Sequence, residues 1–149
     1  HADCCCCYFA SWQRRLESEP GLWQVRHLDS NLLWRNAAFR ALLGLPVSLE
    51  PWPSALRYVH LDDATQVEDS HSRALKTGRL QTLTVRVKIA PHRLSLFLVI
   101  HQAAHCPHCS HCAVIISHVL PLILTPAARI ISIIASIPAS GCACSRANN

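Results

Sequence analysis

The first part of the chain alternates between apolar and polar residues in the manner of β-strands. Residues 22–28 (LWQVRHL) alternate with a period of two, and residues 32–35 (LLWR) form a second short run of the same kind. Between them, residues 29–31 (DSN) include two residue types that tolerate turn conformations. The pattern therefore predicts a β-hairpin over residues 22–35.

A short helix is expected directly after this hairpin. Asn36 can cap it, because an asparagine side-chain oxygen accepts hydrogen bonds from the first free backbone N–H groups. Phe39, Leu42 and Leu43 then fall on one apolar face. Gly44 ends the helix, and a proline two residues later prevents it from restarting.

A longer helix is expected in the middle of the chain. Residues 53–60 fit one or two helical turns, after which Asp62 and Asp63 place negative charge where a helix N-terminus favours it. Gly78 ends this helix after Thr77.

Two further strands complete the pattern. From Leu80 the apolar positions return to a period of two, and residues 94–101 form another strand after a turn at 90–93. This order predicts an α+β domain with a mostly antiparallel sheet and helices packed on one face. We expect it over residues 20–102, after a lead-in at 1–19. Its core should include Trp23, Trp34, Phe39, Leu42, Val67, Leu75, Val85 and Phe97.

Three stretches of this region also match the motifs of a known family: GLWQVRHLDSNLLWRNAAFRALLGLP, WPSALRYVHLDDATQVEDSHSRALKTG and LTVRVK. They contain a Gly-Leu-Trp strand opening, a Trp-x-Asn-x-Ala-Phe entry into a helix, a Val-His-x-Asp-Asp helix start and an Ala-Leu-x-Thr-Gly helix end. On these motifs the region resembles a PAS domain of the PAS-fold-3, PAC-containing type. The matching residues are Gly21, Leu22, Trp23, Trp34, Asn36, Ala38, Phe39, Trp52, Val59, His60, Asp62, Asp63, Ala74, Leu75, Thr77 and Gly78.

The sequence departs from that family at two places. Leu61 stands where the family usually has proline, and after Lys88 the usual hairpin is replaced by IAPHRLSLFLVI. The closing strand of the family is not obvious, but residues 113–120 (AVIISHVL) are rich in β-branched residues and can supply it.

The resemblance implies a sensory or interaction module. PAS domains enclose a pocket between sheet and helices, so we expect a small-molecule ligand or a protein partner, and a homodimer through the sheet or the N-terminal helix as a further option. The chain contains no glycine-rich phosphate loop, no kinase ATP-binding motif and no G-x-S-x-G element. We therefore expect a non-enzymatic signalling module with no cofactor identified, as a fragment of a sensor histidine kinase or a similar protein.

His71 is the candidate cofactor-binding residue. It lies on the apolar face of the helix predicted over 62–77, and some PAS domains bind haem through a helical histidine. The alternative is a core histidine bonded to a backbone carbonyl, and we favour it because the flanking haem pattern of the family is missing. No cysteine lies between residues 8 and 105, so a flavin photoadduct is not expected.

Composition narrows the class of partner. Hydrophobic residues make up 50% of the 149 residues and charged residues 15%, which suits a buried core. The formal net charge is +5, yet no basic face interleaved with aromatic residues is present, and we expect no nucleic-acid partner. The cysteine-free central region and the lack of a signal peptide favour a cytoplasmic location.

The string HCPHCSHC at residues 105–112 supports a rival function. Its soft donors are of the kinds that bind zinc, and the spacing suits two ligands of a zinc knuckle, although a second well-spaced pair is missing. A metal-binding protein is therefore the alternative to a sensory module, and a low-complexity or misread tail is the third interpretation. The candidate ligands are His105, Cys106, His108, Cys109 and Cys112.

The remaining tail, residues 103–149, is rich in Cys, His, Ile, Ser and Pro and has no acidic residue. Residues 113–128 are uncharged but fall just short of a membrane span, so we expect no membrane anchor. Beyond Pro121 we expect poor order, because repeated prolines prevent long regular elements. The chain begins with His1, and we interpret it as a fragment or an incomplete gene model whose tail comes from a readthrough or a frameshift.

Overall fold

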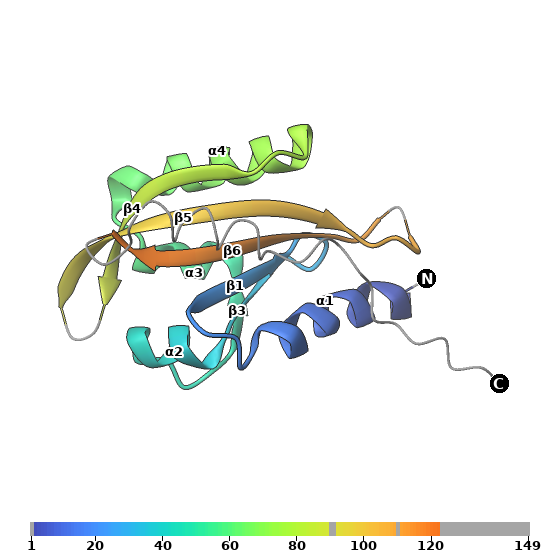
Figure 1. Cartoon of the computed structure of the whole chain (residues 1–149), viewed down its shortest axis with the longest axis horizontal. Coiled ribbons are helices and arrows are strands. Elements are labelled where there is room, and N and C mark those ends of the chain that lie inside the picture. The colour runs from blue at the N-terminus through green and yellow to red at the C-terminus, as the bar shows by residue number, and fades with distance from the viewer. Residues whose placement is uncertain (1, 90–91, 110, 123–149) are drawn as a thin grey trace.

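The computed structural model describes residues 2–89, 92–109 and 111–122, with side chains from Cys7 onward (Figure 1). Four α-helices, one 3-10 turn and six strands occur in these ranges. In chain order they are α1 (Ala2–Leu16), β1 (Leu22–His27), β2 (Leu32–Arg35), α2 (Ala37–Leu43), β3 (Leu49–Pro51), α3 (Trp52–Ala55), η1 (Leu56–Tyr58), α4 (Leu61–Thr77), β4 (Gln81–Ile89), β5 (Arg93–His105) and β6 (Ala113–Pro121).

The strands form one antiparallel sheet in the order β3-β2-β1-β6-β5-β4. The last strand, β6, lies in the centre, between β1 and β5, where both of its edges are paired. Eight of its nine residues are buried, which explains why its sequence is a nearly continuous apolar run. The expected α+β class with a mostly antiparallel sheet is confirmed, and residues 113–120 supply the closing strand.

Local sequence signals explain the hairpin and the helix that follows it. His27 pairs with Leu32 across the β1–β2 turn, where Asn31 adopts a positive φ of 54°. Asn36 caps α2 by accepting from the N–H of Phe39 at 3.2 Å. Gly44 ends α2 with a φ of 68°, a conformation in which glycine avoids the steric cost of a side chain.

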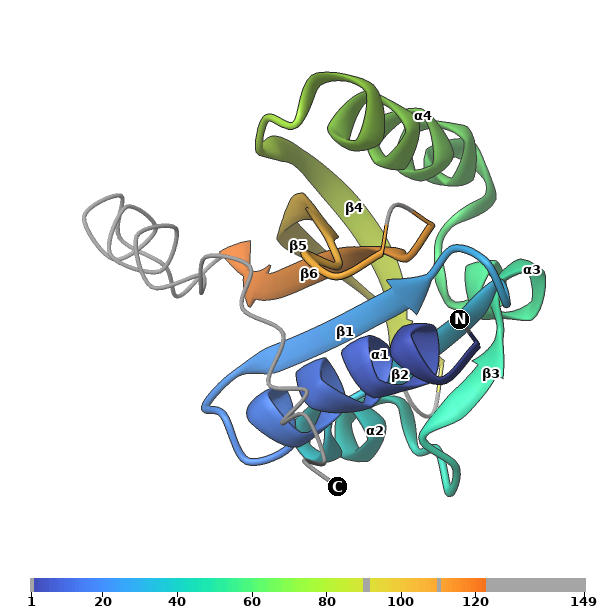
Figure 2. The ribbon, with the colours of Figure 1, turned by 90° about the vertical axis from the view of Figure 1, so that its right-hand side faces the viewer.

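Helices lie on both faces of the sheet (Figure 2). On the inner face, α2, α3 and α4 contribute Phe39, Trp52 and Val67 to one apolar cluster. On the outer face, α1 packs Tyr8 and Trp12, among others, against β1, β2 and β6 in a second cluster. The cysteine run of residues 4–7 belongs to α1, the helix that the lead-in at 1–19 forms.

The predicted core residues are found mainly in these two clusters. Leu42 and Leu75 are half-buried. Outside the expected domain of residues 20–102, the structure adds the end of β5 and the whole of β6 to the sheet. The prediction of poor order beyond Pro121 falls outside the described residues, except for Leu122. The predicted core residues that are buried are Trp23, Trp34, Phe39, Val67, Val85 and Phe97.

No helix within residues 2–89, 92–109 and 111–122 has the length and apolarity needed to cross a membrane.

Leu61, where the sequence departs from the family pattern, is the first residue of α4 and is 82% exposed. Proline suits this position, because the first N–H of a helix has no partner within the helix. The preceding residue, His60, has φ −56° and ψ 138°, which a residue before proline adopts readily.

We predict that Leu61→Pro raises the free energy of unfolding by about 0.4–1 kcal/mol, since proline restricts the unfolded chain. Urea unfolding followed by tryptophan fluorescence measures this change, with Leu61→Ala as the matched control for loss of the exposed side chain. A lower unfolding midpoint for Leu61→Pro than for Leu61→Ala would show that the start of α4 does not have the described conformation.

Candidate functional site

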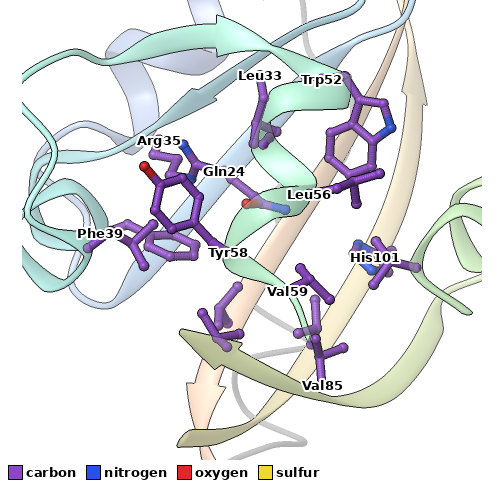
Figure 3. A pocket seen from close by; sticks show the side chains of 16 residues that line it. Gln24, Leu33, Arg35, Phe39, Trp52, Leu56, Tyr58, Val59, Val85 and His101 are labelled. Atoms are coloured by element: carbon purple, nitrogen blue, oxygen red, sulfur yellow. The ribbon is translucent and has the colours of Figure 1, made fainter. Parts of the chain in front are cut away.

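A cavity of about 50 Å³ lies between the inner face of the sheet and the helical segments α2, α3, η1 and α4 (Figure 3). Its walls are mainly apolar: Phe39 comes from α2, Val67 from α4, Val85 from β4 and Val99 from β5. This volume exceeds the roughly 10–15 Å³ that a single water needs. The cavity therefore has room for a few waters or for part of a small ligand.

Polar side chains lie among these apolar walls. Gln24, Arg35, Tyr58 and His101 all line the cavity, and Figure 3 shows Gln24 between Arg35 and His101. Alternation along β1 and β5 explains this placement, because residues two apart on a strand share a face. His101 thus lies on the same face as Phe97 and Val99, toward the helices.

His101 is a buried, neutral imidazole. Its Nδ1 atom lies 2.6 Å from the hydroxyl of Ser117, the residue paired with it on β6. Burial lowers the pKa of His101 to about 3. Its Nε2 atom is buried without a hydrogen-bond partner among the described residues, so one polar atom of a cavity-lining side chain is left unsatisfied.

His71, from α4, packs edge-to-face on His101 with ring centroids 4.3 Å apart. Its Nδ1 atom lies 3.1 Å from Nη1 of Arg26. Because arginine only donates, Nδ1 must accept and the proton of the neutral ring is on Nε2. Burial, His101 and Arg26 together hold the pKa of His71 well below its ordinary value.

Trp52 and Glu68 complete the surroundings of His71. The Trp52 ring lies 4.7 Å from the His71 ring, and the Arg26 guanidinium lies 4.4 Å from the Trp52 ring centroid. Glu68 accepts from the indole N–H of Trp52 and from Arg26. Tight side-chain packing therefore fixes the imidazole of His71 in place.

At another side of the cavity, Arg35 pairs with Glu50, and Arg57 binds the other carboxylate oxygen of Glu50. The Arg35 guanidinium also lies 5.1 Å from the ring of Tyr58. Burial lowers the pKa of Arg35, while its contacts with Glu50 oppose that shift. The buried Nε atom of Arg35 has no hydrogen-bond partner among the described residues.

The structure places His71 beside the cavity rather than in its wall. Its neighbours Arg26 and His101 come from β1 and β5. Spacing along the helix that carries His71 could therefore not have indicated them. Its assignment as a structural residue rather than a haem ligand stays a prediction. Sequence reasoning missed Arg35 and His101, although a histidine in phase with Phe97 and Val99 is a signal that could have been used.

The candidate ligands in the β5–β6 loop do not converge. Within the described part of the chain, no three of the five predicted ligands place donor atoms within 4.8 Å of one another. His105 and His108 are exposed, Cys106 and Cys112 are buried, and Cys109 is half-buried. A metal site formed by this set remains a prediction.

The buried histidines make stability depend on pH. A folded-state pKa below the ordinary 6.5 means that the unfolded chain takes up the proton first as the pH falls. Stability is therefore lost from about pH 6.5 downward, by up to about 1.4 kcal/mol per pH unit for each such histidine. Burial also lowers the pKa of His118, to about 4. The histidines that act in this direction are therefore His71, His101 and His118.

We predict that His101→Gln reduces the slope of unfolding free energy against pH by up to about 1.4 kcal/mol per pH unit between pH 6 and pH 5. Urea titrations across that interval measure the slope. The control is His105→Gln, the same substitution at an exposed histidine at the end of the same strand. Equal slopes for His101→Gln and the unmodified chain would contradict a neutral His101.

The chain resembles known proteins in structure and not in sequence. No family profile matches the chain, and no curated protein matches it in sequence. Solved structures do match. A sensory box histidine kinase/response regulator from Burkholderia thailandensis matches with a TM-score of 0.56 at 11% identity, over 83% of this chain and 90% of that chain.

Two further structures named as PAS domains agree with it. The PAS domain of BvgS from Bordetella pertussis has a TM-score of 0.57 at 14% identity, over 85% of this chain and 93% of that one. The Cycle PAS-B domain of Drosophila melanogaster, with bound ethylene glycol, has a TM-score of 0.51 at 15% identity, over 66% and 96%. Together with the sheet order and the helices on its inner face, these matches show that the chain has the fold of a PAS domain.

Proposed function

We propose that the chain is a non-enzymatic sensory module that binds a small ligand in the inner cavity and passes a conformational change to α1. The observation that supports this most strongly is the pair of buried, unsatisfied atoms on cavity-lining side chains, His101 Nε2 and Arg35 Nε. Leaving such an atom unpaired costs about 1–3 kcal/mol, which a ligand would recover by accepting from Arg35 Nε–H and by bonding to His101 Nε2, which donates or accepts according to the ring tautomer. The ligand would be small and mainly apolar, with a hydroxyl, amide or carboxylate oxygen.

The matched structures support the same type of function. The Cycle PAS-B domain holds ethylene glycol, a small diol, and the Burkholderia protein is a sensory box kinase. A sensor histidine kinase is the kind of longer protein in which we propose this module acts.

The hydrogen bonds of Asn36 connect a cavity-lining residue to the end of α1. Phe39 lines the cavity, and its N–H donates to Oδ1 of Asn36. The amide nitrogen of Asn36 donates to the carbonyl of Leu16, the last residue of α1, at 3.2 Å, and to the carbonyl of Glu19 at 3.3 Å. A displacement of α2 by a ligand would therefore change the contacts at the end of α1.

The cavity is tested with Ala55→Leu, which places a larger side chain at a buried cavity-lining position of α3. Butyramide and butyrate serve as probes, one neutral and one charged, and amide chemical shifts from two-dimensional NMR report binding. In the unmodified chain we expect saturable shifts at cavity residues. Ala55→Leu should abolish them.

The matched control is Ala37→Leu, the same chemical change at an exposed position of α2. It should bind the probes like the unmodified chain. Shifts that persist unchanged in Ala55→Leu would place the binding elsewhere and contradict the proposal.

The route to α1 is tested separately with Asn36→Ser. Serine keeps a capping oxygen for α2 but lacks the amide nitrogen that bonds to the end of α1. Hydrogen exchange of α1 amides should respond to the probe in the unmodified chain and should not respond in Asn36→Ser. An unchanged response would show that Asn36 does not transmit the signal.

A further inference from the structure

The charge of Arg35 gives the inner cavity a preference for one chemical class of ligand. Among the described residues that line the cavity, Arg35 alone is permanently charged, and none is acidic. An arginine guanidinium stays protonated in proteins, so the lowering of its pKa by burial does not remove the charge. The lining therefore contributes one positive charge and no negative charge.

The guanidinium of Arg35 is held in place by the fold itself. Arg35 lies two residues from Leu33 on β2, so both side chains face the cavity. The Arg35 side chain is 4% exposed, and its guanidinium lies 5.1 Å from the ring of Tyr58 and 5.7 Å from the ring of Phe39. Folding has therefore already removed this cation from water, and a ligand that binds it does not have to desolvate or order it.

The carboxylate that contacts Arg35 does not neutralise it completely. One oxygen of Glu50 pairs with Nη1 of Arg35, and the other oxygen pairs with Nη1 of Arg57 at 2.6 Å. Two positive charges and one negative charge leave this group of three side chains with a net charge of +1. The Nε–H of Arg35 is also buried without a hydrogen-bond partner among the described residues. An anionic acceptor would supply both the missing hydrogen bond and the missing charge.

Gln24 places a neutral donor beside Arg35. The two residues pair directly across β1 and β2, and both line the cavity. Figure 3 shows their side chains next to each other at the same side of the cavity. A carboxylate has two acceptor oxygens, one for the N–H of Arg35 and one for the amide N–H of Gln24.

We propose that the ligand of the inner cavity is a short-chain carboxylate, whose oxygens accept from Arg35 and Gln24 and whose alkyl chain lies against the apolar part of the lining. This inference rests on the proposed function and specifies the chemical class of its ligand. An amide or alcohol of the same size offers Arg35 only a neutral oxygen, and hydrogen bonds between two charged groups are stronger. The cavity therefore selects the carboxylate by its charge.

Butyrate and butyramide test this selection, because they have similar size and the same alkyl chain and differ in charge. Their dissociation constants are measured by NMR titration of the full chain at neutral pH. We expect butyrate to bind at least about tenfold more tightly than butyramide. Gln24→Glu keeps the size of the side chain and adds a negative charge beside Arg35. This variant should lose butyrate binding and keep butyramide binding.

Arg57→Gln is the second variant, at an exposed position outside the cavity lining. It leaves Glu50 to pair with Arg35 alone and removes the excess positive charge. Butyrate should then bind about two- to fivefold more weakly, the effect of one exposed charge, while butyramide binding should not change. The matched control is Arg79→Gln, the same substitution at an exposed arginine after α4, which should keep both affinities.

The outcomes separate the class of ligand from the existence of a binding site. Butyramide binding as tight as butyrate binding, or tighter, would overturn the carboxylate assignment and leave the proposed function standing. Binding of neither probe would overturn both. Butyrate binding that persists in Gln24→Glu would place the anion away from Arg35 and also overturn the assignment. If the amide spectrum shows that Gln24→Glu does not fold, Arg57→Gln decides, and an unchanged butyrate affinity in that variant overturns the assignment.

Discussion

Phe39→Ala should lower the free energy of unfolding by about 3–5 kcal/mol, the usual cost of truncating a buried phenylalanine. Phe39 is 4% exposed and packs within the inner apolar cluster, where it forms part of the cavity wall. Removing its ring joins new empty volume to an existing cavity, so the surrounding side chains cannot easily fill the space. Equilibrium urea unfolding measures the loss.

Leu42→Ala is the matched control, because Leu42 lies three residues along the same helix and is only half-buried. Its truncation should cost clearly less than that of Phe39. If both variants lose the same stability, helix propensity or unfolded-state effects dominate and Phe39 is not the core residue described here.

Asn36→Ala should cost at least about 3 kcal/mol, although the side chain is polar and small. Asn36 is fully buried, and its Oδ1 atom accepts from the N–H groups of Trp23 and Phe39. Its Nδ2 amide, which carries two hydrogens, lies within hydrogen-bond distance of three backbone carbonyls, so one hydrogen is shared; they are those of Leu16, Glu19 and Gly21. Alanine removes a helix cap, worth about 1 kcal/mol, and leaves buried backbone groups unpaired at about 1–3 kcal/mol each.

Asn36→Ser separates the two contributions, because serine restores a cap for α2 without restoring the donors. Thermal and urea unfolding should place its stability between those of Asn36→Ala and the unmodified chain. If Asn36→Ala is as stable as the unmodified chain, the hydrogen bonds of Asn36 do not hold α1, β1 and α2 together.

Local signals in the sequence predicted most of the elements. The turn at residues 29–31, the cap at Asn36 and the helix ends at Gly44 and Gly78 act through neighbouring backbone groups, so their effects can be recognised from short stretches. The short strand β3 was missed, because three residues show no period. β6 is central because it pairs with β1 on one side and with β5 on the other. β1 lies far from β6 along the chain, and a loop separates β5 from β6.

The cavity was harder to predict than the fold. The resemblance implied a pocket, but its polar lining combines Gln24, Arg35 and His101 from three different strands. Only the sheet order brings these residues together. His71 was recognised as buried on its helix face, while its arginine and histidine neighbours depend on the same long-range pairing.

We propose that the inner cavity holds a small ligand. The most direct measurement is mass spectrometry of small molecules released by denaturing the purified full chain, compared with the same analysis of Ala55→Leu and Ala37→Leu. We predict a small, oxygen-bearing molecule that is retained by the unmodified chain and by Ala37→Leu and is lost from Ala55→Leu, where the cavity is filled. A molecule retained equally by all three proteins, or none in any of them, would contradict the claim.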